Sequence, residues 1–277
     1  SDNGRPGFRA SDGKTVIEVG ECHLPVAEIG ALWPQLEIDP RSGVRRVMLR
    51  TGSDGELLAG LESESGLPPE FSLDFPLSVH FLGSGGDYLM AGDAHNLMTV
   101  NGVDFLVSPR SFFQVNLAQA GRMVDYVLAN ATLNASDIAL DLYSGVGLFS
   151  AFLAPRVKEL IAVEASESAC DDFAANLDAY NNVSLYVGSA EQILPGLQAT
   201  PDLVLVDPPR AGLAKGVVDY LIKSNASELV YVSCDPSTLA RDCKRLVEGG
   251  FRIRSIQPFD LFPQTYHVET VVLMSRE

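Results

Sequence analysis

The chain has 277 residues, of which 46% are hydrophobic, and its formal net charge at pH 7 is −16. This composition allows a sizeable core or two linked cores, and no apolar stretch is long enough to span a bilayer. The acidic balance opposes non-specific binding to nucleic acid. The first residues show no signal-peptide pattern, and the four cysteines include no C-x-x-C pair, so we expect a reduced, cytoplasmic protein without membrane contact.

Residues 1–110 are expected to form a small, mostly antiparallel β-rich domain. Short apolar runs alternate there with Gly, Ser, Asp and Pro, which is typical of strands joined by turns. The predicted strands are Val44–Leu49, Glu56–Leu61, Leu77–Leu82, Tyr88–Ala91 and Leu97–Leu106. One helix is expected over Val26–Leu36, although Pro34 can end it early, and Gly66–Phe75 is expected to be a loop.

The densest basic run of the chain lies in this first part, at Arg41, Arg45, Arg46 and Arg50. A free-standing RNA-binding protein usually carries a basic face, so this run is a candidate RNA contact. The alternative, which we favour, is a solvated strand edge.

Residues 111–277 change to an α/β pattern. The predicted strands are Ile138–Tyr143, Leu160–Glu164, Ser184–Val187, Leu203–Asp207 and Leu229–Ser233. Helical patterns separate them, most clearly at Leu117–Ala131, Glu167–Tyr180, Lys215–Lys223 and Pro236–Glu248. Strands joined by helical crossovers predict a parallel, doubly wound sheet. Two last strands, Phe251–Gln257 and Val268–Met274, have no helix between them, so we expect an antiparallel hairpin at one sheet edge.

The ends of the first two of these strands indicate a nucleoside cofactor. Asp141–Phe149 runs from a strand through Gly145 and Gly147 into a helix, which lets a ligand approach the backbone. An ordinary βα turn would look similar. Glu164 ends the next strand, where a carboxylate can accept hydrogen bonds from both ribose hydroxyls. At the third strand end, Ser189 can line the adenine site, cap a helix, or do both.

The later strand ends carry groups that can take part in chemistry. Asp207 is followed by Pro208, Pro209 and Arg210, whereas amino-methyltransferases often place an aromatic residue after such a Pro-Pro pair. Cys234 follows the fifth strand at the start of a helix, which favours a thiolate, although Asp235 opposes this and leaves the sign of any pKa shift open.

Near the end of the chain, Glu269 begins an apolar strand, where an unpaired carboxylate is costly to bury. His267 is the rival candidate for a general base. Cys170 and Cys243 fall inside helical patterns, and we expect them to be structural.

Five segments in order resemble the RNA uracil-5-methyltransferases, which act on tRNA or large-subunit ribosomal RNA. The segments are Phe112–Asn116, Asp141–Phe149, Asp207–Gly212, Ser233–Pro236 with Thr238–Asp242, and Asp260–Glu269. The resemblance covers roughly residues 100 to 277. It implies a Rossmann-like methyltransferase domain and an enzyme that uses S-adenosylmethionine to methylate carbon 5 of a uridine.

The resemblance also implies a role for each matching residue. Cys234 matches the nucleophile that adds to carbon 6 of uracil, and Glu269 matches the general base. The positions that match the cofactor site are Gln114, Tyr143, Leu148, Glu164, Ser189 and Asp207. Leu148 and Ser189 depart from relatives that carry Asn there. Phe112 or Phe262 can stack on the target base, or belong to the core.

The first part resembles the family's central domain more loosely. Cys22 matches the fourth ligand of a four-iron cluster found in some members, but the other three cysteines have no counterpart, so we expect neither a cluster nor a metal. We therefore expect a monomeric fragment that lacks an N-terminal RNA-binding domain. Two alternatives stay open: a methyltransferase of another substrate class, which needs no covalent adduct, and a non-catalytic RNA-binding module that keeps the fold.

Overall fold

The structure is a computed structural model that describes residues 4–69, 72 and 75–276. The chain forms two compact units. One comprises Ser1–Met98 and Leu106–Arg110, and the other comprises Thr99–Phe105 and Ser111–Glu277. Within the described ranges, no helix is both long enough and apolar enough to cross a bilayer.

The first unit is built on a four-stranded sheet with the strand order β3-β4-β5-β6. Its strands are β3 (Val44–Thr51), β4 (Leu57–Ser63), β5 (Ser78–Gly83) and β6 (Gly86–Ala91). The sheet is mostly antiparallel, as predicted, but β4 and β5 run parallel. A small core lies against it, formed by Leu32, Ala59, Leu77 and Val79.

The remaining elements of the first unit follow the local sequence. A short antiparallel pair, β1 (Gly7–Arg9) and β2 (Val16–Glu18), precedes helix α1 (Ala27–Leu32). The helix ends before Pro34, as expected, and continues as a 3₁₀ turn at Trp33–Gln35; another 3₁₀ turn follows at Pro40–Ser42. The predicted loop over Gly66–Phe75 has no helix or strand at residues 66–69, 72 and 75, and its other positions lie outside the described residues.

One strand prediction was wrong. Leu97–Leu106 is not a single strand but two, β7 (Asn96–Val100) and β8 (Val103–Val107), which pair as a separate two-stranded sheet. Asn101 and Gly102 both have positive φ, 49° and 80°. Asn-Gly is the preferred sequence for a two-residue hairpin turn with this geometry, so the turn chemistry overrides the apolar run.

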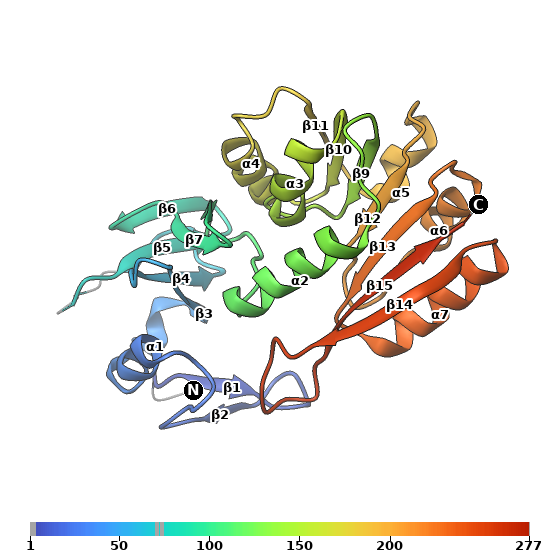
Figure 1. Cartoon of the computed structure of the whole chain (residues 1–277). Coiled ribbons are helices and arrows are strands. Elements are labelled where there is room, and N and C mark those ends of the chain that lie inside the picture. Colours follow the sequence, from blue (N-terminus) through green and yellow to red (C-terminus); the bar gives the residue numbers. More distant parts are fainter. Residues whose placement is uncertain (1–3, 70–71, 73–74, 277) are drawn as a thin grey trace. The chain divides into compact units, whose positions relative to one another are not determined.

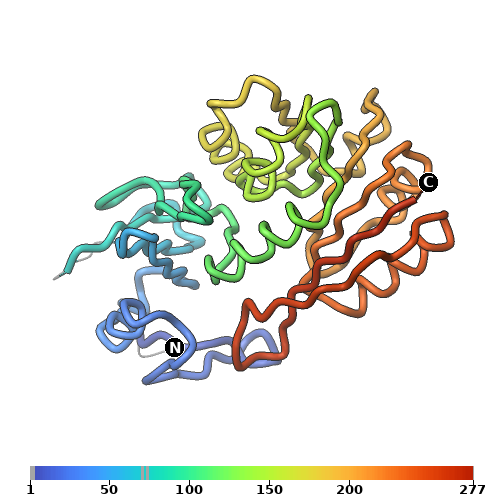
Figure 2. The backbone as a smooth tube through the Cα atoms, in the orientation of Figure 1, coloured from blue at the N-terminus to red at the C-terminus, as the bar shows by residue number. Residues whose placement is uncertain are grey.

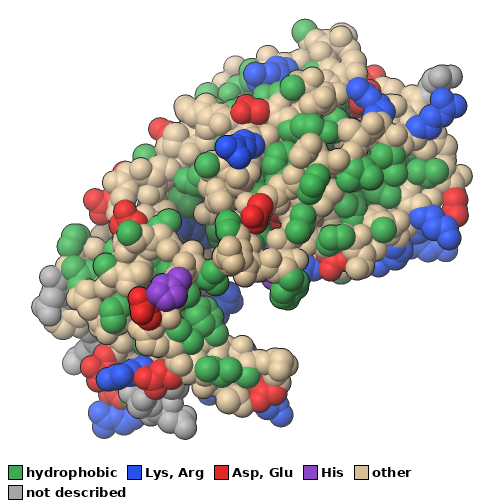
Figure 3. All heavy atoms as spheres, turned by 60° about the horizontal axis from the view of Figure 1, so that its bottom comes forward, with side chains coloured by type: hydrophobic (Ala, Val, Ile, Leu, Met, Phe, Trp, Pro, Cys, Tyr) green, Lys and Arg blue, Asp and Glu red, His purple; other side chains and the backbone are tan. Residues whose placement is uncertain are grey.

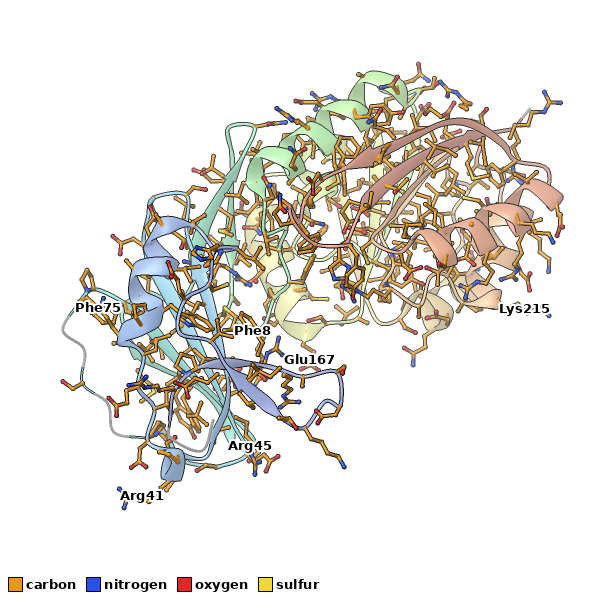
Figure 4. The ribbon with its side chains drawn as sticks, turned by 90° about the horizontal axis from the view of Figure 1, so that it is seen from below. Phe8, Arg41, Arg45, Phe75, Glu167 and Lys215 are labelled. Carbon is orange, nitrogen blue, oxygen red and sulfur yellow. The ribbon has the colours of Figure 1, made fainter. Side chains whose placement is uncertain are left out.

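The basic run lies on and beside the edge strand β3. Arg41, Arg45 and Arg46 are exposed and pair with Asp39, Glu64 and Glu62 respectively. Arg41 and Arg45 project outward from the ribbon (Figure 4). On the face drawn in Figure 3, basic side chains are interspersed with acidic ones. These ion pairs support the interpretation as a solvated strand edge.

The second unit contains a seven-stranded sheet with the order β11-β10-β9-β12-β13-β15-β14. The strands are β9 (Ile138–Leu142), β10 (Glu159–Glu164), β11 (Val183–Val187), β12 (Leu203–Val206), β13 (Glu228–Ser233), β14 (Arg252–Phe259) and β15 (Glu269–Ser275). The first five run parallel, and β15 is antiparallel to both β13 and β14. The predicted doubly wound sheet with a C-terminal hairpin is confirmed.

Helices cover both faces of this sheet. On one face lie α2 (Leu117–Asn130), α3 (Leu148–Leu153) and α4 (Glu167–Asn176); on the other lie α5 (Ala190–Ile193), α6 (Lys215–Lys223) and α7 (Pro236–Glu248) (Figure 1). Two further 3₁₀ turns occur at Ala154–Arg156 and Leu194–Gly196. The alternation of strand and helix can be followed along the tube in Figure 2. Because β9 to β13 run parallel, their carboxyl ends share one edge of the sheet, and the amino end of β15 meets them there.

Candidate active site

The turn after β9 leaves room for a ligand next to its backbone. Tyr143, Gly145 and Gly147 all have positive φ, of 63°, 56° and 95°. A side chain placed on Gly145 would meet no atom within 4 Å, so the space beside this glycine is open. Tyr143 and Ser144 donate their backbone N–H groups to the carbonyl of Val163, at 2.9 and 3.2 Å, which fixes the turn to β10.

Two buried polar atoms of this turn have no hydrogen-bond partner among the described residues. Asp141 is 1% exposed, and its Oδ2 accepts a 2.6 Å bond from Ser150, whereas its Oδ1 and Ser144 Oγ are unpaired. Burial raises the pKa of Asp141 to about 7, with a smaller contribution from the charge of Glu164. Unpaired buried polar atoms are costly, so both atoms suit a polar ligand at this strand end.

Glu164, at the end of β10, is held against the same turn. Its Oε2 accepts a 2.8 Å bond from Gly145 N, and its Oε1 accepts 2.8 Å bonds from the N–H groups of Ala165 and Ser166. These bonds fix the position of a partly exposed carboxylate that keeps further lone pairs. Glu164 can therefore accept hydroxyl donors without first being ordered.

The other predicted cofactor residues differ in what they offer. Gln114 is 5% exposed and its Oε1 has no partner within the described ranges. Leu148 is buried as the first residue of α3, so only its backbone can bond to a ligand. Ser189 is the N-cap of α5, as one of its two interpretations predicted, and its N–H donates to Gln192 Oε1 at 3.2 Å.

Tyr143 directs its side chain to the face of the sheet that carries α5. The hydroxyl bonds to Glu191, and burial together with this carboxylate raises the pKa of Tyr143. The side chain lines an open hollow of about 530 Å³ that Pro209, Lys215 and Arg245 also line. At the glycine turn, Tyr143 therefore offers its backbone.

Asp207 follows β12 directly and lies between the glycine turn and the end of β13. Its N–H donates to the carbonyl of Leu142 at 3.3 Å. The pKa of Asp207 lies well above its ordinary range, mainly because of burial and further because of the charges of Glu269 and Asp141. A nearby positive charge would lower this pKa and favour the ionised form.

Cys234 directly follows β13, and Glu269 is the first residue of the neighbouring strand β15. Ser233 of β13 pairs with Thr270 of β15, so the next positions in this antiparallel register are Cys234 and Glu269. Glu269 is 5% exposed, and burial raises its pKa to about 7. Burial, and then the Glu269 charge, raise the pKa of Cys234 above its ordinary value. The sequence left open whether the pKa of Cys234 is raised or lowered; in the structure it is raised, so Cys234 is a thiol in the free protein.

Arg210 joins this pair, although the sequence interpretation assigned it no site role. Its guanidinium hydrogen-bonds to Cys234 and lowers the pKa values of both Cys234 and Glu269, which partly offsets burial. It also lies 3.1 and 3.2 Å from the two ring nitrogens of His267. Its backbone is held by Thr238 Oγ1, which donates to the Arg210 carbonyl at 3.1 Å. The sequence feature that could have indicated a role for Arg210 is its position directly after Asp207-Pro208-Pro209, at the end of a strand.

The other cysteines of this unit are buried within helices. Cys170 lies in α4 and Cys243 in α7, at 5% and 6% exposure, and burial raises the pKa of each thiol to about 11. Asp235, next to Cys234, caps α7 by accepting from Ser237 N and Thr238 N, both at 2.9 Å. Among the cysteines that the structure describes in this unit, only Cys234 is partly exposed and also lies near both a cation, Arg210, and a carboxylate, Glu269.

Comparisons with known proteins identify RNA methyltransferases as relatives of this chain. A family model described as tRNA (Uracil-5-)-methyltransferase matches residues 95–200 and 196–277. An uncharacterized RNA methyltransferase of Streptomyces avermitilis is 34% identical over 98% of this chain and 64% of its own length. One from Lactobacillus johnsonii is 38% identical over 69% of this chain and 43% of its own length. The chain thus spans only part of these relatives.

Two solved methyltransferase structures are similar to this chain. A Pyrococcus abyssi tRNA (uracil-54, C5)-methyltransferase in complex with S-adenosyl-L-homocysteine superposes with a TM-score of 0.73 and 29% identity, over 97% of this chain and 72% of that one. A precorrin-6y C5,15-methyltransferase of Geobacter metallireducens has a TM-score of 0.50 and 15% identity, over 62% and 94%. The second likeness shows the fold alone, which many substrate classes share.

Proposed function

The chain belongs to the tRNA (uracil-5-)-methyltransferase family, and on that premise we propose that it transfers a methyl group from S-adenosylmethionine to carbon 5 of a uridine in tRNA or rRNA. The observation that carries the proposal is that Cys234 directly follows β13 while Glu269 begins the neighbouring strand β15, with Arg210 bonded to the thiol. A methyltransferase that acts on an amino group needs neither a nucleophilic thiol nor a second, separate base.

The residues around the glycine turn fit S-adenosylmethionine. Glu164 suits the two ribose hydroxyls, and the unpaired oxygens of Asp141, Ser144 and Gln114 suit the polar groups of a nucleoside and an amino acid. The open space at Gly145 lets the cofactor lie against the backbone. Ser189 and the backbone atoms of Tyr143 and Leu148 complete the proposed site. When bound, the cofactor supplies a methyl group on a positively charged sulfur.

Asp207 is proposed to face that sulfur. It is a half-buried carboxyl group whose raised pKa falls when a positive charge approaches, so binding of the sulfonium would favour its ionised form. Without a positive charge nearby, the surroundings of Asp207 disfavour its charged form. Asp207 thereby favours the charged cofactor over its neutral product.

Cys234 begins the proposed reaction by adding to carbon 6 of uracil. The partly exposed Cys234 thiol passes its proton to water, and the Arg210 guanidinium stabilises the thiolate. The sulfur–carbon bond that forms moves the π electrons of the ring toward carbon 5 and the neighbouring carbonyl, which makes carbon 5 nucleophilic. Carbon 5 then takes the methyl group from sulfur in line.

Glu269 completes the reaction by removing the proton on carbon 5. The electron pair of that C–H bond re-forms the C5–C6 double bond, and the Cys234 thiolate leaves. A general base works best when its pKa lies near the operating pH, and burial brings Glu269 to about 7. The products are 5-methyluridine, S-adenosylhomocysteine and a proton.

The remaining assignments are proposals about the whole protein. We propose that residues 111–277 carry out catalysis and that the β-rich part at 1–110 faces the RNA. The target uridine must leave its stack or lie in a loop to reach Cys234. We further propose a cytoplasmic monomer.

The test is capture of the covalent intermediate. The chain is mixed with S-adenosylmethionine and 5-fluorouridine-containing transcripts of tRNA and rRNA, because fluorine on carbon 5 cannot be removed by Glu269. On a denaturing gel, wild type should give a slow protein–RNA species and Cys234→Ala should give none. Cys243→Ala, which changes a buried cysteine of α7, is the matched control and should react like wild type. Methyl transfer by Cys234→Ala would point instead to another class of methyltransferase, and cofactor binding without any adduct to a non-catalytic module.

A further inference from the structure

The loop between β14 and β15 is tied together by its own hydrogen bonds. The carbonyl of Phe262 accepts from Thr265 N at 3.1 Å and from Thr265 Oγ1 at 2.8 Å, and Gln264 turns the chain with a φ of 64°. Thr265 Oγ1 also accepts from His267 N at 3.2 Å. Leu261, only 1% exposed, anchors the start of the loop. These hydrogen bonds therefore define the conformation of the loop.

Three aromatic rings of this loop form a row with His267 in the middle, and Arg210 links His267 to the nucleophile. Arg210, which bonds to Cys234, reaches the ring of His267. The His267 ring lies edge-on to Phe262, with 5.7 Å between centroids, and close to Tyr266, with 4.1 Å between centroids. Tyr266 ends the row at 86% exposure. A large side chain held this far into solvent offers a ring face to a partner at little further cost in conformational entropy.

We propose that Tyr266 is a stacking platform for an unpaired RNA nucleotide next to the target uridine. This inference rests on the proposed function, because the partner is the RNA whose uridine reaches Cys234. Extrusion of a target base exposes the faces of its neighbours, and aromatic side chains stack on such faces whatever the base. The ring of His267 packs against the ring of Tyr266.

The charge of the chain favours this kind of contact. With a net charge of −16 and the arginines near β3 already paired to carboxylates, phosphate neutralisation is a weak source of affinity here. Stacking on a neutral ring needs no counterion release. Tyr266 therefore supplies affinity where the acidic surface does not.

The test is equilibrium binding of a fluorescently labelled, single-stranded, uridine-containing RNA dodecamer, measured by anisotropy. Tyr266→Ala should bind about 5- to 150-fold more weakly, the range that loss of base–aromatic stacking gives. Tyr266→Phe should bind like wild type. The matched control is Tyr186→Ala, a 42% exposed tyrosine on β11 at the opposite side of the sheet, and it should leave binding unchanged. The slope of log affinity against log salt should be equal for all four proteins, because no phosphate contact changes.

Measuring RNA binding and methyl transfer separately distinguishes failure of the stacking proposal from failure of the proposed function. If wild type methylates RNA but Tyr266→Ala binds the dodecamer as tightly, the stacking platform is refuted and the proposed function stands. If binding requires the ring of Tyr266 but no RNA is methylated, the proposed function is refuted; Tyr266 then still stacks on RNA, but its place beside a target uridine is refuted too. A Tyr266→Phe variant as weak as Tyr266→Ala, or a wild type that binds no RNA, also overturns the inference.

Discussion

Replacement of Glu269 by Gln should stop the proposed reaction after methyl transfer and before release of the RNA. The amide has nearly the shape of the carboxyl group, so β15 keeps its register with β13. Addition of Cys234 and attack on the methyl group do not require a base at this position. Removal of the carbon 5 proton does, so the methylated RNA should remain bonded to Cys234.

The size of the effect follows from the pKa of Glu269. With a pKa of about 7, roughly a tenth of Glu269 is ionised at pH 6 and about nine-tenths at pH 8. Release in the wild type should therefore accelerate roughly tenfold over this interval. The Gln variant should lose about 10²- to 10⁴-fold in release, as expected for loss of a general base, and should show no such rise with pH.

The assay follows methyl-labelled cofactor on a denaturing gel after a single turnover at pH 6, 7 and 8. Glu269→Gln should accumulate a labelled protein–RNA species, whereas wild type should release labelled RNA. His267→Ala is the control, since the ring of His267 contacts Arg210 and two aromatic rings. Normal release by Glu269→Gln together with an accumulated adduct in His267→Ala would show that His267 is the base.

Four further predictions follow from the site. Glu164→Ala should weaken S-adenosylmethionine binding by about 1.5–3 kcal/mol, measured by calorimetry, and unchanged affinity would remove Glu164 from the cofactor site. Glu269→Gln should be more stable to urea than wild type at pH 8, by up to about 3 kcal/mol, and equally stable near pH 4. A carboxyl pKa raised in the folded state costs stability as pH rises through it, so a pH-independent difference would refute the shift. Arg210→Ala should slow adduct formation at neutral pH, where Cys234 is mostly a thiol, and slow it less as the pH rises toward the thiol pKa, in stopped-flow mixing with 5-fluorouridine RNA; equal rates at neutral pH would remove Arg210 from thiolate stabilisation. The purified chain should carry no stoichiometric iron, since Cys22 is a lone match, and metal analysis with the visible spectrum decides this.

Much of the second unit could be predicted because its local signals agree with one another. The helices at Lys215–Lys223 and Pro236–Glu248 have the predicted bounds. At the second, Asp235 caps the helix and Pro236 occupies its first position, so sequence alone marks the start. Because no helical pattern separates the last two strands, the sequence predicted the antiparallel hairpin that β14 and β15 form. Residues that follow different parallel strands lie at the same edge of the sheet, so the sequence also indicated which distant residues come close together there.

The features that were missed depend on contacts between residues far apart in the sequence. The parallel pairing of β4 with β5 leaves no local mark, because both strands look like members of a meander. Arg210 gains its role from His267 and Cys234, which lie on other elements. The direction of the Cys234 pKa shift depends on burial and on Glu269, neither of which the helix-start argument contained.

The reversed direction of β15 has a practical consequence for experiments on this protein. Glu269 is the first residue of the strand and Ser275 the last, so the two ends lie roughly 20 Å apart at the usual rise per residue. A fluorophore or surface tether attached beyond Ser275 would therefore sit at the far end of the sheet from the reacting groups. Single-molecule recordings of RNA capture and release could use this end as the anchor, at a distance from Glu269.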